Sequence, residues 1–324
     1  PPRAVSLLAR RRYGFEPATA AIVLASPMQG SLGMSLSATE AAFEGFRVVR
    51  RKPTVVAWWA LAYLVLFAVA FALAGPSLIE VMTIADTMNA ANPSPADMQR
   101  LGAAYAGLAW LLPAGLLFGA VLNTAIARAV LRPEEGRLGY LRLGADEFRV
   151  LGATLLLTLA GAAITLLAAF AAGLLVGLAS FAGQAVAWLV GLLAGAAVLV
   201  LVVFLAIRFS LVIPATFTDK RMAFKESWRA TKGVFWPLLG MAVIAVIMSI
   251  VVGLLGGIVA LPLTLATGGM QTLTSMEGAS FGEMLSTAGP AIATWIVVNS
   301  ILSTLQMVAI YAPFAAAWRD MRSA

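Results

Sequence analysis

Charged residues are spaced very unevenly along this chain. Between Arg149 and Arg208 no side chain carries a charge, and most residues are apolar. A helix needs about 20 apolar residues to cross the ~30 Å hydrocarbon core of a bilayer, so this stretch is long enough for two crossings. The small and polar cluster Ser180–Gln184 lies near its middle. The pattern therefore predicts two transmembrane helices joined by a short turn.

Apolar stretches long enough to span a bilayer also occur on both sides of this one. The first is expected to end at Gly75 and Pro76, and the second at Arg128. We therefore expect an all-α, polytopic membrane protein with six transmembrane helices. The expected spans cover residues 55–74, 105–127, 151–178, 185–207, 236–261 and 291–312.

The composition favours a single integral membrane domain over residues 34–324. Hydrophobic residues make up 61% of the chain, charged residues 11%, and the mean hydropathy is +0.93, which is typical of membrane proteins. The chain contains no Cys and no His. This removes disulfides, thiolate nucleophiles, His bases and the usual zinc and haem ligands. We therefore expect no metal, no cofactor and no enzymatic activity.

Basic residues indicate the orientation. The connections on one side of the predicted membrane hold most of the Lys and Arg, whereas those on the other side hold only Arg100 and several acidic residues. Cytoplasmic loops carry the excess of basic residues, so both termini are expected in the cytoplasm. Residues 1–33 contain an apolar patch that is too short for a secretory signal. We expect them to be a disordered tail or upstream translation, with Met34 as the start.

Each pair of spans is preceded by a short amphipathic segment, at residues 38–51, 138–151 and 219–232. The chain is therefore expected to contain three copies of one unit, an amphipathic helix followed by a helical hairpin. In the first copy, Ser37 and Glu40 match a capping box, and Pro53 is expected to end the helix.

In the third copy, four basic residues at helical spacings predict one basic stripe. Trp228 lies on a neighbouring face, so the helix is expected to lie flat in the interface with its cations among anionic phosphates. The alternative is that these charges only set orientation. Nucleic acid is not expected as a partner, despite a net charge of +7, because the basic residues adjoin apolar spans. The stripe consists of Arg221, Lys225, Arg229 and Lys232.

A string of residues entering the fifth span is similar to a known membrane domain. Arg208, Pro214 and the pattern Ala-Phe-x-x-Ser-Trp-x-x-Thr-Lys-Gly-x-Phe-Trp at residues 223–236 resemble the membrane domain of glycerophosphoryl diester phosphodiesterases and of YciC-like proteins. The resemblance implies six spans led by amphipathic segments, in a bacterial inner membrane. The catalytic barrel of those phosphodiesterases is rich in His and Glu and has no counterpart here, so hydrolase activity is not implied.

Polar residues within the spans allow two interpretations, and glycines within the spans predict close helix packing. Asn299, Ser303 and Gln306 share one face of the sixth span, where they either form interhelical hydrogen bonds or line a substrate path. The motif Gly-Leu-Leu-x-Gly begins at Gly115, Gly173, Gly191 and Gly253. Glycines four apart let helices approach closely, so these motifs predict tight packing.

Taken from the sequence alone, the best-supported function is a structural or accessory role. No predicted span carries a charged residue at its middle, which disfavours an ion-coupled carrier. The alternative is a permease or exporter of a small molecule, which the six spans and the Asn299 face would allow, and an enzyme comes last. Expected partners are membrane lipids, together with a protein partner or a second copy of the chain.

Overall fold

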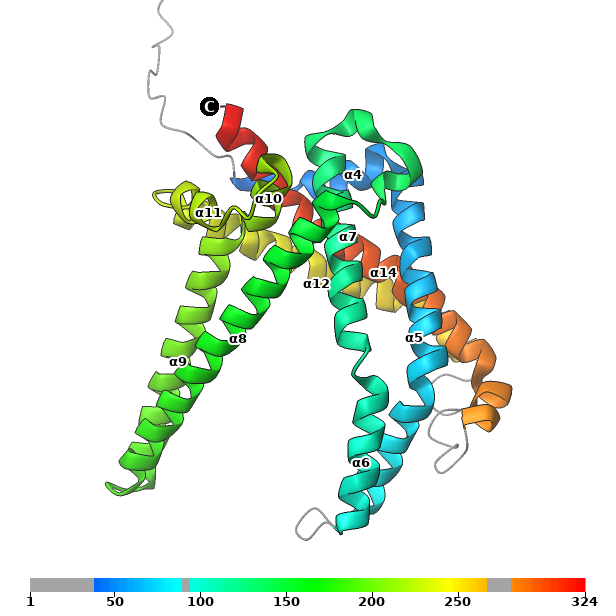
Figure 1. The fold of residues 1–324 in the computed structure, drawn as a ribbon, viewed down its shortest axis with the longest axis vertical. Coiled ribbons are helices and arrows are strands. Elements are labelled where there is room, and N and C mark those ends of the chain that lie inside the picture. Colours follow the sequence, from blue (N-terminus) through cyan, green and yellow to red (C-terminus); the bar gives the residue numbers. More distant parts are fainter. Residues whose placement is uncertain (1–37, 89–93, 267–280, 324) are drawn as a thin grey trace, which may run out of the picture. The chain divides into compact units, whose positions relative to one another are not determined.

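The computed structural model describes residues 38–88, 94–266 and 281–323, and all regular structure within these ranges is helical (Figure 1). The predicted tail at residues 1–33 and the capping residue Ser37 lie outside the described residues. In chain order the helices are α3 (Ala38–Ala42), α4 (Glu44–Arg51), α5 (Pro53–Thr87), α6 (Pro95–Leu108), α7 (Leu111–Leu131), η1 (Pro133–Glu135), η2 (Arg137–Tyr140), α8 (Ala145–Ser180), α9 (Gln184–Phe209), α10 (Val212–Asp219), α11 (Phe224–Ala230), α12 (Phe235–Ala266) and α14 (Phe281–Ser323).

Within the described residues, 6 helical stretches are long and apolar enough to cross a bilayer. This confirms the predicted all-α membrane class and the number of candidate spans. Each stretch is longer than predicted, because the apolar core of a span marks the hydrocarbon layer and the helix continues beyond it. The stretches are Pro53–Ala85, Pro95–Leu131, Leu138–Ser180, Gln184–Asp219, Phe235–Leu263 and Phe281–Ser323.

Two prolines shape the first two stretches differently. The predicted end at Pro76 is wrong, because α5 continues through this residue to Thr87. A membrane helix tolerates an internal proline when neighbouring helices pack around it, and here α5 packs against α6. The second stretch is instead broken between α6 and α7. Pro113 lies in the first turn of α7, where its missing N–H needs no partner.

The first amphipathic segment forms α3 and α4, which are packed against other helices. Lys52 separates α4 from α5, and Pro53 opens α5, so the predicted end of the helix at Pro53 is confirmed. The α4 helix lies directly on α14. A Cβ added at Gly45 would lie 2.8 Å from both Ala309 Cα and the Val308 carbonyl oxygen. Only glycine permits this approach of the two backbones.

The other two amphipathic segments differ from the expectation. Residues 138–151 form no separate helix, because Leu138, Gly139 and Tyr140 all have positive φ angles and the next helix begins only at Ala145, as the start of α8. In the third segment, α11 covers Phe224–Ala230, which is shorter than the predicted 219–232. Residues with positive φ angles cannot continue an α-helix, so the helical spacing of apolar and basic residues did not produce the long amphipathic helices that it predicted.

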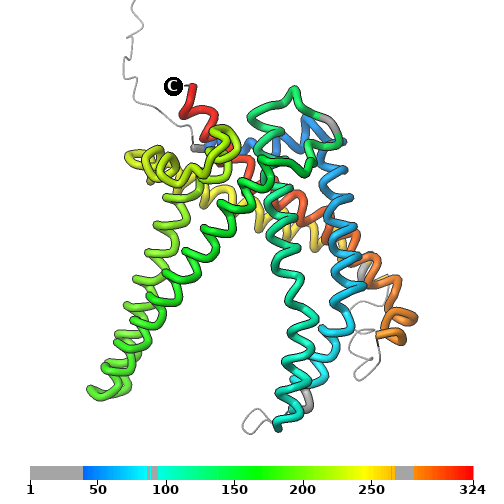
Figure 2. Tube along the Cα trace, viewed as in Figure 1, coloured from blue at the N-terminus to red at the C-terminus, as the bar shows by residue number. Residues whose placement is uncertain are grey.

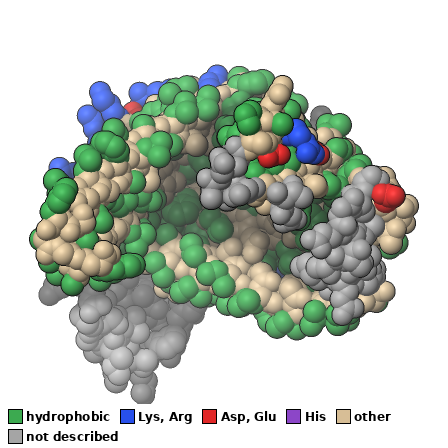
Figure 3. Space-filling model, turned by 90° about the horizontal axis from the view of Figure 1, so that it is seen from below, with side chains coloured by type: hydrophobic (Ala, Val, Ile, Leu, Met, Phe, Trp, Pro, Cys, Tyr) green, Lys and Arg blue, Asp and Glu red, His purple; other side chains and the backbone are tan. Residues whose placement is uncertain are grey.

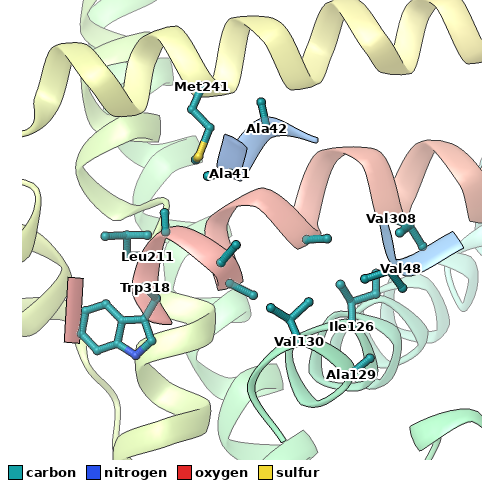
Figure 4. Packing of buried hydrophobic residues seen from close by; sticks show 14 of the residues in the cluster. Ala41, Ala42, Val48, Ile126, Ala129, Val130, Leu211, Met241, Val308 and Trp318 are labelled. Carbon is teal, nitrogen blue, oxygen red and sulfur yellow. The ribbon is translucent and has the colours of Figure 1, made fainter. Parts of the chain in front are cut away.

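The largest buried cluster lies where α3, α4, α7, α10, α12 and α14 meet. Figure 4 shows Val48 beside Val308 and Ile126, and Met241 beside Ala42. Small residues of α14 allow this convergence, because Ala312, Ala315, Ala316 and Ala317 are buried there. The core therefore adjoins the basic connections between spans.

The hairpin of α8 and α9 contrasts with this core. The two helices run side by side (Figure 2) and pack on each other, yet large side chains near the turn, such as Phe170, Phe181 and Trp188, are exposed. On the face seen in Figure 3, hydrophobic side chains are widespread and charged ones are few among the described residues. An apolar exterior of this extent is expected for helices surrounded by lipid.

The predicted use of the glycine motifs is wrong for most of them. A Cβ at Gly115, Gly119, Gly173 or Gly177 would meet no atom within 4 Å, and one at Gly191 would meet only Val176, at 3.5 Å. Among the four motifs, tight approach occurs only in that of α12, where Gly253 faces Gln306 and Gly256 faces Leu302. A motif that permits close packing does not by itself bring a partner helix.

Candidate lipid-headgroup site

The predicted basic stripe is divided by the shortness of α11. Lys225 and Arg229 lie on α11, whereas Arg221 precedes it and Lys232 follows it. The prediction that all four share one helix is therefore wrong. Arg221 pairs with Glu226, with 2.7 Å between Nη2 and Oε1, so its charge is already neutralised within the protein.

The other three cations are free of such pairing. Lys225, Arg229 and Lys232 are all exposed. Among residues 38–88, 94–266 and 281–323, no carboxylate forms an ion pair with any of them. Three exposed positive charges thus lie within one short segment, with no acidic residue of the described chain to balance them.

Trp228 holds α11 against the end of α9. Its ring centroid lies 5.5 Å from that of Phe209 and 6.1 Å from that of Phe204, the latter in an edge-on arrangement. The side chain is nevertheless 39% exposed. Trp228 therefore combines an aromatic contact with the protein and a surface facing outward, as tryptophans do at the membrane interface.

Arg208 lies at the centre of this aromatic group. Its guanidinium carbon is 4.8 Å from the centroid of Trp228 and 5.3 Å from that of Phe204, so the cation stacks on both rings. Nη1 donates two long hydrogen bonds, to the Trp228 carbonyl oxygen at 3.4 Å and to Thr231 Oγ1 at 3.5 Å. Nε is buried and has no partner. The guanidinium therefore keeps donors that the described protein does not satisfy.

Two hydroxyls fix the backbone beneath this arginine. Ser227 Oγ donates to the Arg208 carbonyl oxygen at 3.0 Å. Thr231 Oγ1 lies 3.4 Å from the same oxygen, although its nearest acceptor is the Ser227 carbonyl oxygen at 3.0 Å. The last carbonyls of a helix have no partner within the helix, so these bonds both satisfy α9 and position α11. Both hydroxyl residues are fully buried, and Arg208 is thereby held in place by its own main chain.

Within the described residues, no group of three or more potential metal ligands comes together. What this site offers is a planar cation with unused N–H donors, next to exposed Lys and Arg side chains. Guanidinium donors match the oxygens of a phosphate or a carboxylate. The arrangement is therefore suited to an anionic group outside the protein. Sequence reasoning named Arg208 as the end of the uncharged stretch and as part of the family resemblance, but missed its central position in this site.

Two amides on the polar face of the sixth span donate hydrogen bonds to backbone carbonyls. Asn299 Nδ2 donates to the Trp295 carbonyl oxygen of its own helix, at 2.9 Å. Gln306 Nε2 donates to the Ser249 carbonyl oxygen of α12, at 3.3 Å. Ser303 is half-buried on the same helix. The bond of Gln306 crosses between helices, as the packing interpretation expects.

A second polar cluster, around Arg128, was not predicted at all. Nη2 of Arg128 lies 2.6 Å from Glu147 Oε1, and the two side chains are 3% and 2% exposed. Nη1 donates to the Tyr140 carbonyl oxygen at 2.8 Å. The Tyr140 hydroxyl accepts from Lys52 at 2.6 Å and donates to the Pro133 carbonyl oxygen at 2.7 Å.

This cluster closes the connection between α7 and α8. Trp59 Nε1 adds a bond to the Gly139 carbonyl oxygen at 2.7 Å, so α5 holds the same loop. The sequence offered one signal, an acidic residue at the start of a span among basic neighbours. It could not show which cation that acid meets, because the pairing depends on the turn with positive φ angles.

Comparisons of this chain with models of protein families, with curated proteins and with solved structures found no match. The resemblance to the membrane domain of glycerophosphoryl diester phosphodiesterases and YciC-like proteins therefore stays a prediction, and the functional argument depends on the residues themselves.

Proposed function

We propose that this chain is a non-catalytic, multi-pass protein of a bacterial inner membrane that binds anionic phospholipid headgroups at its basic end. Arg208 is the central residue of this site. The observation that carries the proposal is the state of its guanidinium, which is stacked on Trp228 and Phe204 but has no acidic partner among the described residues and has an unpartnered Nε.

The chemistry of a phosphodiester fits this state. A phosphate has a negative charge and several acceptor oxygens. One phosphate can therefore neutralise the charge of Arg208 and accept hydrogen bonds from its unused donors. Stacking on two rings holds the guanidinium plane in one orientation, which lowers the entropy cost of binding. A neutral headgroup would provide the oxygens without balancing the charge.

The exposed cations add a less specific attraction. Lys225, Arg229 and Lys232 are each worth ~1 kcal/mol against an anionic leaflet. We infer that they raise the local concentration of anionic lipid and that Arg208 then holds one headgroup. Trp228 would meet the same lipid at the interface, where tryptophan rings are enriched.

The orientation and the repeat belong to the same proposal. We propose that both termini face the cytoplasm, because they lie on the same side as the connections rich in Lys and Arg, which are cytoplasmic in most membrane proteins. We also propose that the chain derives from three units, each an amphipathic segment followed by a hairpin. The accessory role follows from the residue inventory, since a chain without His or Cys offers few groups that exchange protons near neutral pH. We do not propose transport, because Asn299 and Gln306 bond to backbone carbonyls.

The lipid site is tested by retention of lipid on the purified full chain. Native mass spectrometry would compare bound phosphatidylglycerol with bound phosphatidylcholine. We expect phosphatidylglycerol to be preferred, and Arg208→Gln to lower its retention about tenfold or more, as loss of a hydrogen bond to a charged group implies. Arg221→Gln is the matched control, because that arginine is already paired with Glu226. Equal losses for the two variants would contradict the proposal.

The orientation is tested separately, and the absence of native cysteine makes the experiment direct. A cysteine placed at Asp97 should react with a membrane-impermeant thiol reagent in intact cells, whereas cysteines at Glu134 and Lys225 should react only after lysis. Labelling of the Lys225 position in intact cells would overturn the orientation.

A further inference from the structure

A cavity of about 230 Å³ lies among α7, α8, α9, α10 and α14. It is partly open, since Ala206 is exposed and Leu157, Phe209, Ile213 and Phe314 are half-buried. An apolar cavity of ~150 Å³ can take up benzene, so by proportion this one has room for about nine non-hydrogen atoms. Its lining consists of Asn123, Ala127, Leu157, Ala206, Phe209, Ser210, Ile213, Pro214, Ile310, Tyr311, Phe314 and Ala315.

The lining is apolar except for three side chains and carries no charge. Asn123 interacts with Tyr311, yet its Oδ1 has no hydrogen-bond partner, although the residue is only 6% exposed. Ser210 Oγ donates to the Ile207 carbonyl oxygen at 2.9 Å, so its donor is used and its oxygen can still accept. A buried acceptor without a partner is costly. The cavity therefore favours an occupant that carries a hydrogen-bond donor.

The expected depth of Asn123 in the membrane indicates which kind of molecule could bind in the cavity. It precedes Arg128 on α7 by five residues, which corresponds to about 7.5 Å along the helix at ~1.5 Å per residue. Asn123 is thus expected just below the layer of charged side chains. A hydroxyl next to the glycerol backbone of a lipid, with its hydrocarbon below, would lie at this level. An ionic group is disfavoured, because no lining side chain could balance its charge.

We propose that this cavity binds an uncharged, hydroxyl-bearing lipid, such as an acylglycerol or a long-chain alcohol. Its hydroxyl donates to Asn123 Oδ1 and accepts from Tyr311, while the first part of its chain packs between Leu157, Phe209 and Phe314. This site adjoins the headgroup site, and the two share Phe209, whose ring lies 5.5 Å from that of Trp228. Arg208 and Phe204 do not line the cavity and instead contact Trp228 of α11.

Photolabelling of the purified full chain in lipid nanodiscs tests the proposal. The probes are a diazirine-bearing octanol and the diazirine-bearing octane of the same length. In the wild type, the alcohol should label peptides that contain Ser210, Pro214 or Tyr311 more strongly than the alkane, and dioleoylglycerol should compete. Asn123→Leu should lower labelling by the alcohol about three- to tenfold, which is the worth of one hydrogen bond, without lowering labelling by the alkane.

The matched control is Asn299→Leu, which removes an amide of the same type that bonds to its own helix and does not line the cavity. It should change neither signal. If Asn123→Leu does not fold, Ala206→Phe fills the cavity from an exposed position and should lower both signals. Equal labelling by the two probes, or labelling by the alcohol that survives Asn123→Leu, would overturn the proposal. Absence of label from the cavity would do the same, since it would mean that water alone occupies the space.

Discussion

Arg128 and Arg208 occupy equivalent positions, each in the last turn of a long apolar helix, but the protein treats them in opposite ways. Arg128 is buried and ion-paired to Glu147 at 2.6 Å, with a second bond to a backbone carbonyl. Arg208 is half-buried, stacks on two rings and has only two hydrogen bonds, of 3.4 and 3.5 Å. The charge of Arg128 is compensated by an acidic residue of the same chain, whereas the charge of Arg208 has no acidic partner among the described residues.

This difference separates a structural arginine from a binding arginine. A buried charge is tolerated only when a partner compensates for its loss of hydration, which is the state of Arg128. An arginine that is only half-buried and forms no ion pair loses less of its hydration and can still bind an anion. A count of basic residues next to the spans treats the two arginines alike. Only the contacts of each side chain show whether it has a structural role or can bind a ligand.

The largest expected effect comes from breaking the Arg128 pair. Glu147→Gln removes the closer of the two counter-ions of Arg128 and leaves only Glu135, whose Oε2 lies 3.6 Å from Nε. Because Arg128 stays buried, the loss should be about 3 kcal/mol of unfolding free energy in detergent, at the lower end of the range for a broken buried pair. Arg149→Gln is the control, because Arg149 forms a partly exposed pair with Asp146 on the same helix, and such pairs contribute ~0–1 kcal/mol. Similar losses for the two variants would show that Arg128 is solvated rather than compensated.

The second expected effect is recovery in the double variant. Arg128→Met with Glu147→Leu removes both charges and replaces them with apolar groups, which is often neutral or stabilising for buried pairs. We expect the double variant to regain most of the stability that Glu147→Gln loses, and a double-mutant cycle with the single variants measures the coupling. A double variant as unstable as the singles would show that the bond from Arg128 to Tyr140 matters more than the pair.

Arg208→Gln should have a smaller effect on stability. It loses cation–π contacts worth about 0.5–1 kcal/mol and two long hydrogen bonds, while no acid is left unpaired. We expect a loss of at most about 1 kcal/mol in lipid-free detergent, far below that of Glu147→Gln, together with the loss of lipid retention. A stability loss as large as that of Glu147→Gln would place Arg208 among the structural residues.

Much of the fold follows from the sequence because bilayer thickness sets the length of apolar stretches. The six candidate spans and the turn near Ser180–Gln184 were predicted on this basis. The end of the first amphipathic segment at Pro53 was predicted because proline breaks a helix. The continuation of α5 through Pro76 was not, because it depends on how α6 packs beside it. The separate middle helix was wrong for a similar reason, since a turn with positive φ angles at Leu138–Tyr140 follows from tertiary contacts.

The candidate site was predictable only in part. Periodicity placed Trp228 and four cations in one segment, but it treated those cations as equivalent. The structure separates Arg221, which pairs with Glu226, from Lys225, Arg229 and Lys232, which do not. Arg208 was missed as a site residue, and Asn123 was considered only as one of several polar side chains within the spans. Stacking on rings and an unpartnered buried oxygen are properties of side chains brought together by folding.

The smallest expected effect is that of a single exposed cation. Lys232→Gln removes ~1 kcal/mol of attraction to an anionic leaflet, which corresponds to about a fivefold loss of phosphatidylglycerol retention at low salt. Because Lys232 is exposed, this difference should vanish near 1 M salt, where the Debye length falls to ~3 Å. The effect of Arg208→Gln should persist there, since a half-buried pair is screened less. If salt removed both effects equally, Arg208 would act as one more surface charge, and the distinction from Arg128 would be only one of burial.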